Sequence, residues 1–147
     1  MRICVDTTVL LDILKDEYPE FQDRVYTAIK NREQLVSPVI VYAELLPQFK
    51  GVSDLLDSFL DEHKITIEPL DMESAREASF RWMKYLKRKS RIKCPECGHL
   101  LSSKEHLLSD FYIGGYAVTK CDAIITRDRG VYRKYFPELR NYTGKSD

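Results

Sequence analysis

Short apolar runs alternate with longer amphipathic segments along this chain, and the two patterns predict strands and helices in turn. The expected strands lie at about 3–5, 34–36, 65–67 and 124–125. Helical spacing of apolar residues follows each of the first three, most clearly over 20–30, 53–59 and 72–89. Such alternation favours an α/β domain built around a small parallel sheet.

Residues that favour helix starts mark several of the expected boundaries. Ser37 is expected to cap a helix with Pro38 at its first position, and Asp71 is expected to cap the longest helix. Ser109 should cap a further helix, which leaves Asp110 in its first turn. Thr7 and Thr8 can cap the helix after the first strand in the same way.

Two aspartates stand just past the ends of expected strands. Asp6 directly follows the run at 3–5, and Asp128 follows the run at 124–125 after a short polar stretch. The carboxyl ends of neighbouring parallel strands meet at one edge of the sheet, where ligands and catalytic groups collect. We therefore expect these two carboxylates to converge.

Two further carboxylates are candidates for the same edge. Glu44 lies within a mostly apolar helical segment, and Asp110 lies at an expected helix start. Each of the four acidic residues also has a purely structural interpretation, as a helix cap, a turn residue or half of an ion pair. Gathered together, however, they would repel one another unless a divalent cation bound between them.

Composition sets broad limits on the protein class. The chain has 147 residues, with no linker-like stretch, which predicts one domain over 1–147. Lysine and arginine together number 23, as do aspartate and glutamate, so nucleic-acid binding would need local patches. No leader or membrane-length apolar run is evident, and we expect a cytoplasmic protein. Cys4 and Cys121 are expected to be small core residues.

A segment at about 91–106 differs in character from the rest of the chain. Its C-P-x-C-G turn, with Cys94 and Cys97, is typical of a structural Zn²⁺ site, and His99 and His106 are nearby candidates for the remaining ligands. A reducible dithiol is the alternative interpretation. It is the weaker one, because a redox motif usually lies at a strand-to-helix turn, whereas this motif follows a basic helix end.

Three blocks of the sequence resemble a known family. They are ICVDTT at 3–8, the stretch from Ser37 to Glu44, and the stretch 109–136, which includes DFYIG and TRDRGVY. Together they resemble PIN-domain ribonucleases, and within that family the VapC-type toxins and related archaeal proteins. The segment at 91–106 departs from the common pattern.

The resemblance implies a three-layer α/β/α, Rossmann-like fold and a Mg²⁺- or Mn²⁺-dependent endoribonuclease. Its catalytic and metal-binding residues would be Asp6, Glu44, Asp110 and Asp128, supported by the hydroxyl of Thr126. Basic residues beside Asp128 would contact the RNA backbone, namely Arg127, Arg129, Arg133 and Lys134. We also predict a homodimer, and the toxin resemblance implies a small antitoxin as protein partner.

Two other function classes compete with this interpretation. A haloacid-dehalogenase-type phosphatase also begins with a strand and an aspartate, but it needs a second aspartate two residues later, where this chain has Thr8. The second alternative is a non-catalytic, zinc-stapled module for RNA binding or assembly. It would use the C-x-x-C segment and the basic end of the long helix, which includes Lys84, Lys87, Arg88 and Lys89.

Overall fold

Five parallel strands form the middle layer of the protein. The structure is a computed structural model, and it describes residues 1–89, 107–128 and 130–145. The strands are β1 (Arg2–Val5), β2 (Gln34–Pro38), β3 (Ile65–Glu68), β4 (Ala123–Ile125) and β5 (Arg140–Asn141). Their order across the sheet is β3-β2-β1-β4-β5, and every neighbouring pair is parallel.

The central strand β1 fixes the register of its two neighbours. Cys4 pairs with Val36 on one side and with Ile124 on the other. Ile3, Cys4 and Val5 have no exposed surface. A strand that is covered on both faces reads as a continuous apolar run, which explains why the pattern at 3–5 was visible in the sequence.

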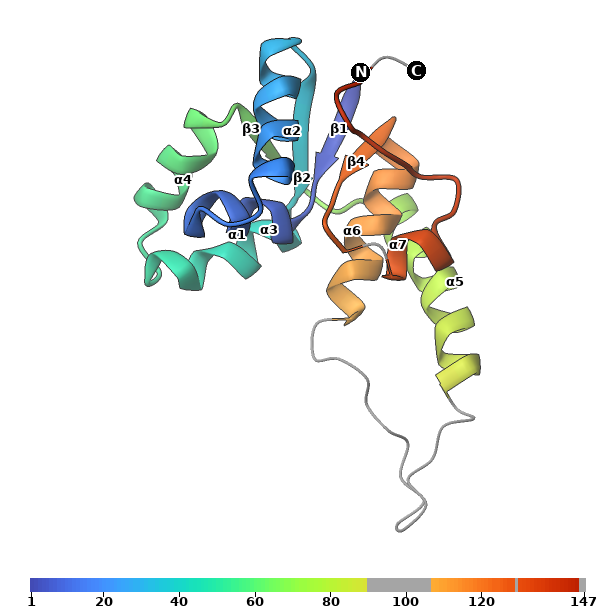
Figure 1. The fold of residues 1–147 in the computed structure, drawn as a ribbon. Coiled ribbons are helices and arrows are strands. Elements are labelled where there is room, and N and C mark those ends of the chain that lie inside the picture. The colour runs from blue at the N-terminus through green and yellow to red at the C-terminus, as the bar shows by residue number, and fades with distance from the viewer. Residues whose placement is uncertain (90–106, 129, 146–147) are drawn as a thin grey trace.

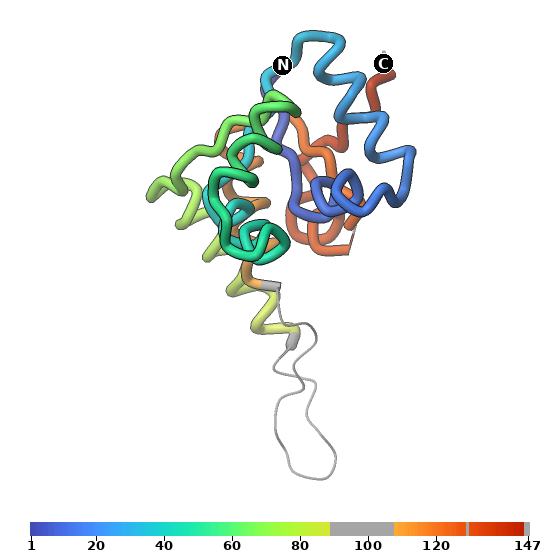
Figure 2. Tube along the Cα trace, turned by 90° about the vertical axis from the view of Figure 1, so that its left-hand side faces the viewer, coloured from blue at the N-terminus to red at the C-terminus, as the bar shows by residue number. Residues whose placement is uncertain are grey.

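Helices cover both faces of this sheet, so the fold has three layers. The helices are α1 (Thr7–Lys15), α2 (Pro19–Lys30), α3 (Val39–Leu45), α4 (Ser53–Glu62), α5 (Met72–Lys89), α6 (Leu107–Lys120) and α7 (Gly130–Tyr135), with a short 3-10 helix, η1, at Leu46–Phe49. On one face α6 contacts β1, β2 and β4, and α5 packs outside α6. Figures 1 and 2 show α2 on the other side of the sheet, where α1 packs against it. The predicted α/β/α architecture is confirmed.

The contact between α5 and α6 depends on a residue without a side chain. A Cβ atom at Gly115 would lie only 2.6 Å from the carbonyl oxygen of Ser74 and 2.8 Å from the backbone nitrogen of Ala78. The two backbones can therefore approach closely, and the Ser74 hydroxyl lies 2.7 Å from the hydroxyl of Thr119 across the same contact. This close packing anchors the helix that carries Asp110.

The predicted helix starts at Ser37 and Ser109 are wrong. β2 runs through Ser37 to Pro38, and α3 begins only at Val39. The hydroxyl of Ser37 donates a 2.7 Å hydrogen bond to the carbonyl oxygen of Val5 on the neighbouring strand, so it does not cap a helix. Ser109 lies inside α6, which begins at Leu107, three residues earlier than predicted.

Other local predictions are confirmed. Asp71 caps α5, because its Oδ1 accepts a 2.9 Å hydrogen bond from the backbone N–H of Ser74. Asp110 lies in the first turn of α6. Cys4 is buried and Cys121 is half-buried beside the sheet.

Within the residues that the structure describes, no helix is long and apolar enough to cross a membrane.

Candidate functional site

Asp6 lies at the carboxyl end of β1, at the position where Figure 1 shows that strand running into α1. Its side chain is only 1% exposed and caps α1, in place of the predicted threonine caps, by accepting a 2.8 Å hydrogen bond from the backbone N–H of Thr7. The hydroxyls of Thr8 and Thr126 donate to its Oδ2 over 2.9 and 2.7 Å. The Tyr132 hydroxyl lies 3.4 Å from its Oδ1. These four donors hold the carboxylate in one orientation.

Thr126 also connects Asp6 to Asp128. The hydroxyl oxygen of Thr126 accepts a 3.1 Å hydrogen bond from the backbone N–H of Asp128. The Oδ1 atom of Asp128 in turn accepts a 3.0 Å hydrogen bond from the backbone N–H of Gly130, the first residue of α7. The half-buried Asp128 is therefore fixed at the sheet edge that carries Asp6, as the strand pattern predicted.

Glu44 reaches the same edge from α3. Its Oε1 atom accepts a 2.9 Å hydrogen bond from the hydroxyl of Thr7, the residue that follows Asp6. The side chain of Glu44 is half-buried, between the fully buried Val41 and Leu45. Two carboxylates from different elements are thus separated by a single threonine.

The electrostatics of Tyr132 show how the aspartates are grouped. Burial raises the pKa of the Tyr132 phenol well above its ordinary value, and the negative charges of Asp6, Asp110 and Asp128 raise it further. Burial also raises the pKa of Asp6, with an added contribution from the charge of Asp128. Hydrogen bonds from Thr126, Thr8 and Thr7 oppose that rise. Three aspartates from three separate parts of the chain therefore act on one buried phenol.

The donor set at this edge fits a hard divalent cation, because it consists of carboxylate and hydroxyl oxygens. Among the described residues, no three Asp, Glu, His or Cys side chains stand close enough together to surround an ion directly. Mg²⁺ usually keeps several waters and takes one or two carboxylates, so a loosely gathered group suits it better than it suits Zn²⁺.

Comparisons with known proteins identify the family. The PIN-domain profile matches residues 3–137, which is most of the chain. The chain belongs to the PIN-domain family. It is also similar in fold to a chain in the crystal structure of VapBC2 from Rickettsia felis bound to a DNA fragment from their promoter, with a TM-score of 0.68 and 14% sequence identity over 96% of this chain and 97% of that one. No curated protein matches the sequence significantly.

In this PIN domain the basic residues near Asp128 have different surroundings. Arg133 and Lys134 lie exposed on α7. Arg127 forms an ion pair with Asp12, and Arg129 lies outside the described residues. Cys94, Cys97, His99 and His106, the predicted zinc ligands, also lie outside them.

Sequence reasoning missed the partner of Arg127. Asp12 lies on α1 and is 1% exposed, and its two carboxylate oxygens accept hydrogen bonds of 3.0 and 3.2 Å from the Arg127 guanidinium. The guanidinium also lies 4.0 Å from the centre of the Tyr18 ring. Asp12 interrupts an apolar run between Leu11 and Ile13, and this pattern could have indicated a buried carboxylate that needs a partner. The pair fixes the segment between Thr126 and Asp128 against α1.

We predict that Arg127→Met destabilises the protein by about 2–3 kcal/mol, because it leaves the buried carboxylate of Asp12 unpaired. Breaking a fully buried ion pair typically costs about 3–5 kcal/mol. The loss expected here is smaller, because the Arg127 side chain is 35% exposed and water screens its charge. Urea unfolding measures the loss. Arg133→Met, which removes an exposed charge nearby, is the matched control, and the double variant Asp12→Asn/Arg127→Met should recover part of the stability. Equal stabilities of the Arg127 and Arg133 variants would contradict the prediction.

We also predict a pH-dependent stability difference between the wild type and Asp6→Asn, without divalent ions. Folding raises the pKa of Asp6 above 3.8, its unperturbed value, so its protonated form stabilises the fold below that pH. This contribution is lost as pH rises through the folded pKa. Asp6→Asn should therefore gain stability relative to the wild type between about pH 3 and pH 7. Melting curves of both proteins across this pH range test the prediction. A variant that loses stability relative to the wild type as pH rises would refute it.

Proposed function

We propose that this protein is a Mg²⁺- or Mn²⁺-dependent endoribonuclease that hydrolyses phosphodiester bonds of RNA. Two findings support the proposal. PIN domains are generally metal-dependent nucleases, and this chain is a member of the family. The second finding carries the proposal, and it is the group of carboxylates at the carboxyl edge of the sheet. Thr126 forms hydrogen bonds to both Asp6 and Asp128, and Thr7 forms hydrogen bonds to both Asp6 and Glu44.

The protein's own residues would divide the work as follows. Asp6 is held by the backbone N–H of Thr7 and the hydroxyl of Thr126, so its oxygens are oriented before substrate binds. Asp110, Asp128 and Glu44 add negative charge that would hold a cation at this edge. A bound Mg²⁺ or Mn²⁺ would supply charge to the phosphate and lower the pKa of a bound water.

RNA would approach this edge along α7. Arg133 and Lys134 are exposed there, and contacts to phosphates from such residues supply affinity that does not depend on base sequence. Arg127 has a smaller part in this proposal than the sequence suggested, because its guanidinium already binds Asp12. Its proposed role is to position the segment that carries Thr126 and Asp128.

We further propose that the protein is a homodimeric toxin with a small antitoxin partner. The resemblance to VapC-type toxins supports this, alongside the similarity in fold to a chain of the VapBC2 complex. The antitoxin would insert an arginine or lysine among the carboxylates, since a guanidinium pairs well with such a group. Light scattering at micromolar concentration should give the mass of a dimer. A neighbouring gene for a small protein should accompany this one.

We predict that Cys94 and Cys97 bind structural Zn²⁺ together with His99, His106 or both. This prediction rests on the sequence alone, because all four residues lie outside the described part of the structure. Elemental analysis of protein washed with a chelator should give about one zinc per chain. A Cys94–Cys97 disulfide with only traces of zinc would exclude the site.

The central prediction concerns the four carboxylates. Replacing Asp6, Glu44, Asp110 or Asp128 by its amide should keep the fold and reduce cleavage of single-stranded RNA by about a hundredfold or more. Mg²⁺ should also stabilise each variant less than it stabilises the wild type. A cleavage assay and melting curves with and without Mg²⁺ measure both effects.

Asp23→Asn provides the matched control, because Asp23 is an exposed carboxylate on α2. It should leave both cleavage and the response to Mg²⁺ unchanged. A purely structural role for the four carboxylates predicts lower stability of the amide variants and no dependence on Mg²⁺. Full cleavage by Asp6→Asn and Asp128→Asn would end the nuclease proposal as it is argued from these carboxylates.

A further inference from the structure

A cavity of about 560 Å³ opens directly beside the carboxylate site. The two share part of their lining, because Thr126, Asp128 and Tyr132 border the cavity as well as the site. The cavity extends from there past α7 towards the edge strand β5. A group that fills it would lie next to whatever the carboxylates hold.

The walls of this cavity combine an apolar part with a few polar groups. Ile124 comes from β4, and Phe136, Pro137 and Leu139 come from the segment that joins α7 to β5. Such walls suit a flat, weakly polar group. The exposed side chain of Arg133 borders the cavity on the α7 side and adds a positive charge.

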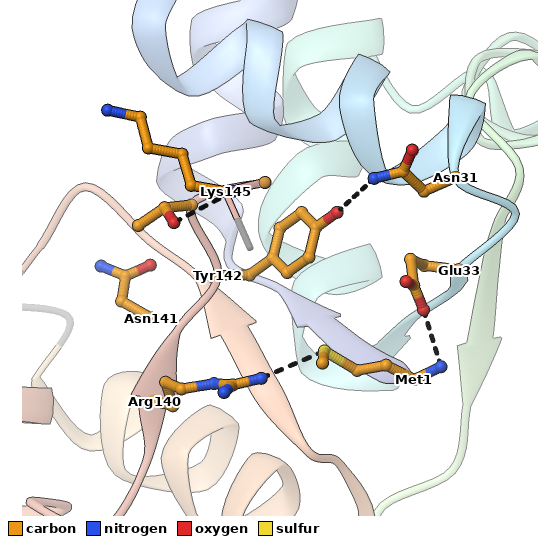
Figure 3. Close-up of a pocket in the computed structure, with 9 residues that line it drawn as sticks. Met1, Asn31, Glu33, Arg140, Asn141, Tyr142 and Lys145 are labelled. Atoms are coloured by element: carbon orange, nitrogen blue, oxygen red, sulfur yellow. Dashed lines mark hydrogen bonds and ion pairs between the residues drawn. The ribbon is translucent and has the colours of Figure 1, made fainter. Parts of the chain in front are cut away.

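Asn141 adds a carboxamide to the lining, from β5. Its Nδ2 atom donates a 3.3 Å hydrogen bond to the carbonyl oxygen of Thr126, and this fixes the amide orientation because a flipped amide would place two oxygens together. Its Oδ1 atom is buried and accepts no hydrogen bond from any described residue. Figure 3 shows the side chain beside Tyr142 and Arg140, with no bond to the other residues of the pocket drawn there.

The pocket in Figure 3 is a poorer candidate for substrate. It is smaller, at about 330 Å³, and Met1, Glu33 and Arg140 line it at the amino ends of the strands. The carboxylates lie at the opposite edge. The cavity beside Asp128 is the one that adjoins the proposed chemistry.

We propose that this cavity receives one nucleobase of the RNA strand, next to the phosphate that is cleaved. The inference rests on the proposed ribonuclease function and adds a base-recognition site to it. Apolar and aromatic walls would cover the faces of the base, and the amide of Asn141 would meet its polar edge, as amides do in base recognition. Arg133 would bind the adjoining phosphate. A preference for one base beside the cut bond follows from this arrangement.

The test is cleavage of a randomised single-stranded RNA, with the fragment ends sequenced. The wild type should favour particular bases at one position beside the cut by about tenfold. Asn141→Leu, which removes the amide, should abolish most of this preference. Leu139→Trp, which fills the cavity, should slow cleavage about tenfold by excluding the base. Melting temperatures confirm that each variant folds, and the two variants act on the cavity by independent means.

Arg133→Ala and Lys134→Ala form a matched pair, because both remove one exposed positive charge from α7 but only Arg133 borders the cavity. Lys134→Ala should weaken cleavage of all sequences alike and keep the base preference, whereas Arg133→Ala should slow cleavage more. An unchanged preference in Asn141→Leu together with undiminished cleavage by Leu139→Trp overturns the base pocket and leaves the ribonuclease intact. A wild type without any base preference does the same. A wild type that cleaves no RNA instead overturns the proposed function, and the base pocket with it.

Discussion

The 2.7 Å hydrogen bond from the hydroxyl of Thr126 to the buried carboxylate of Asp6 joins the ends of the two central strands. A carboxylate that is 1% exposed is unfavourable unless donors surround it, and the chain supplies them from α1, from Thr126 just after β4, and from α7. The backbone continues the link, because the N–H of Asp6 donates to the carbonyl oxygen of Ile125 over 3.0 Å. The position of Asp128 follows from this junction, since its own N–H bonds to the same Thr126 hydroxyl.

The elements that could be predicted from the sequence are those whose burial produces a regular pattern of apolar residues. β1 is covered on both faces, and its apolar run was legible for that reason. Ser37 shows where local reasoning fails, because its hydroxyl bonds to Val5 across the sheet and a distant partner overrides its capping preference. β5 could not be predicted, since two residues form no periodic pattern.

The same distinction applies to the candidate site. Asp6 and Asp128 were placed by the rule that parallel strands end at one edge, which needs only the strand pattern. The contact of Glu44 with Thr7 depends on how α3 packs against α1, and sequence spacing carries no information about that. Arg127 was grouped with the basic RNA contacts because it stands beside Asp128. Its ion pair with Asp12 forms because the loop after β4 packs against α1, and sequence spacing does not predict that contact.

The hydrogen bonds of Asp6 also bear on how a cation could bind there. Four donors occupy the two oxygens, which is about the full acceptor capacity of a carboxylate. Three of these donors are hydroxyls, and a hydroxyl can turn its proton elsewhere. The fourth is the backbone N–H of Thr7, which cannot move without unwinding the start of α1. A cation that approached Oδ2 would therefore displace only the protons of Thr8 and Thr126, while the N–H of Thr7 kept the carboxylate in place. An edge arranged in this way would hold its geometry with or without a cation, as the proposed metal-dependent site would require.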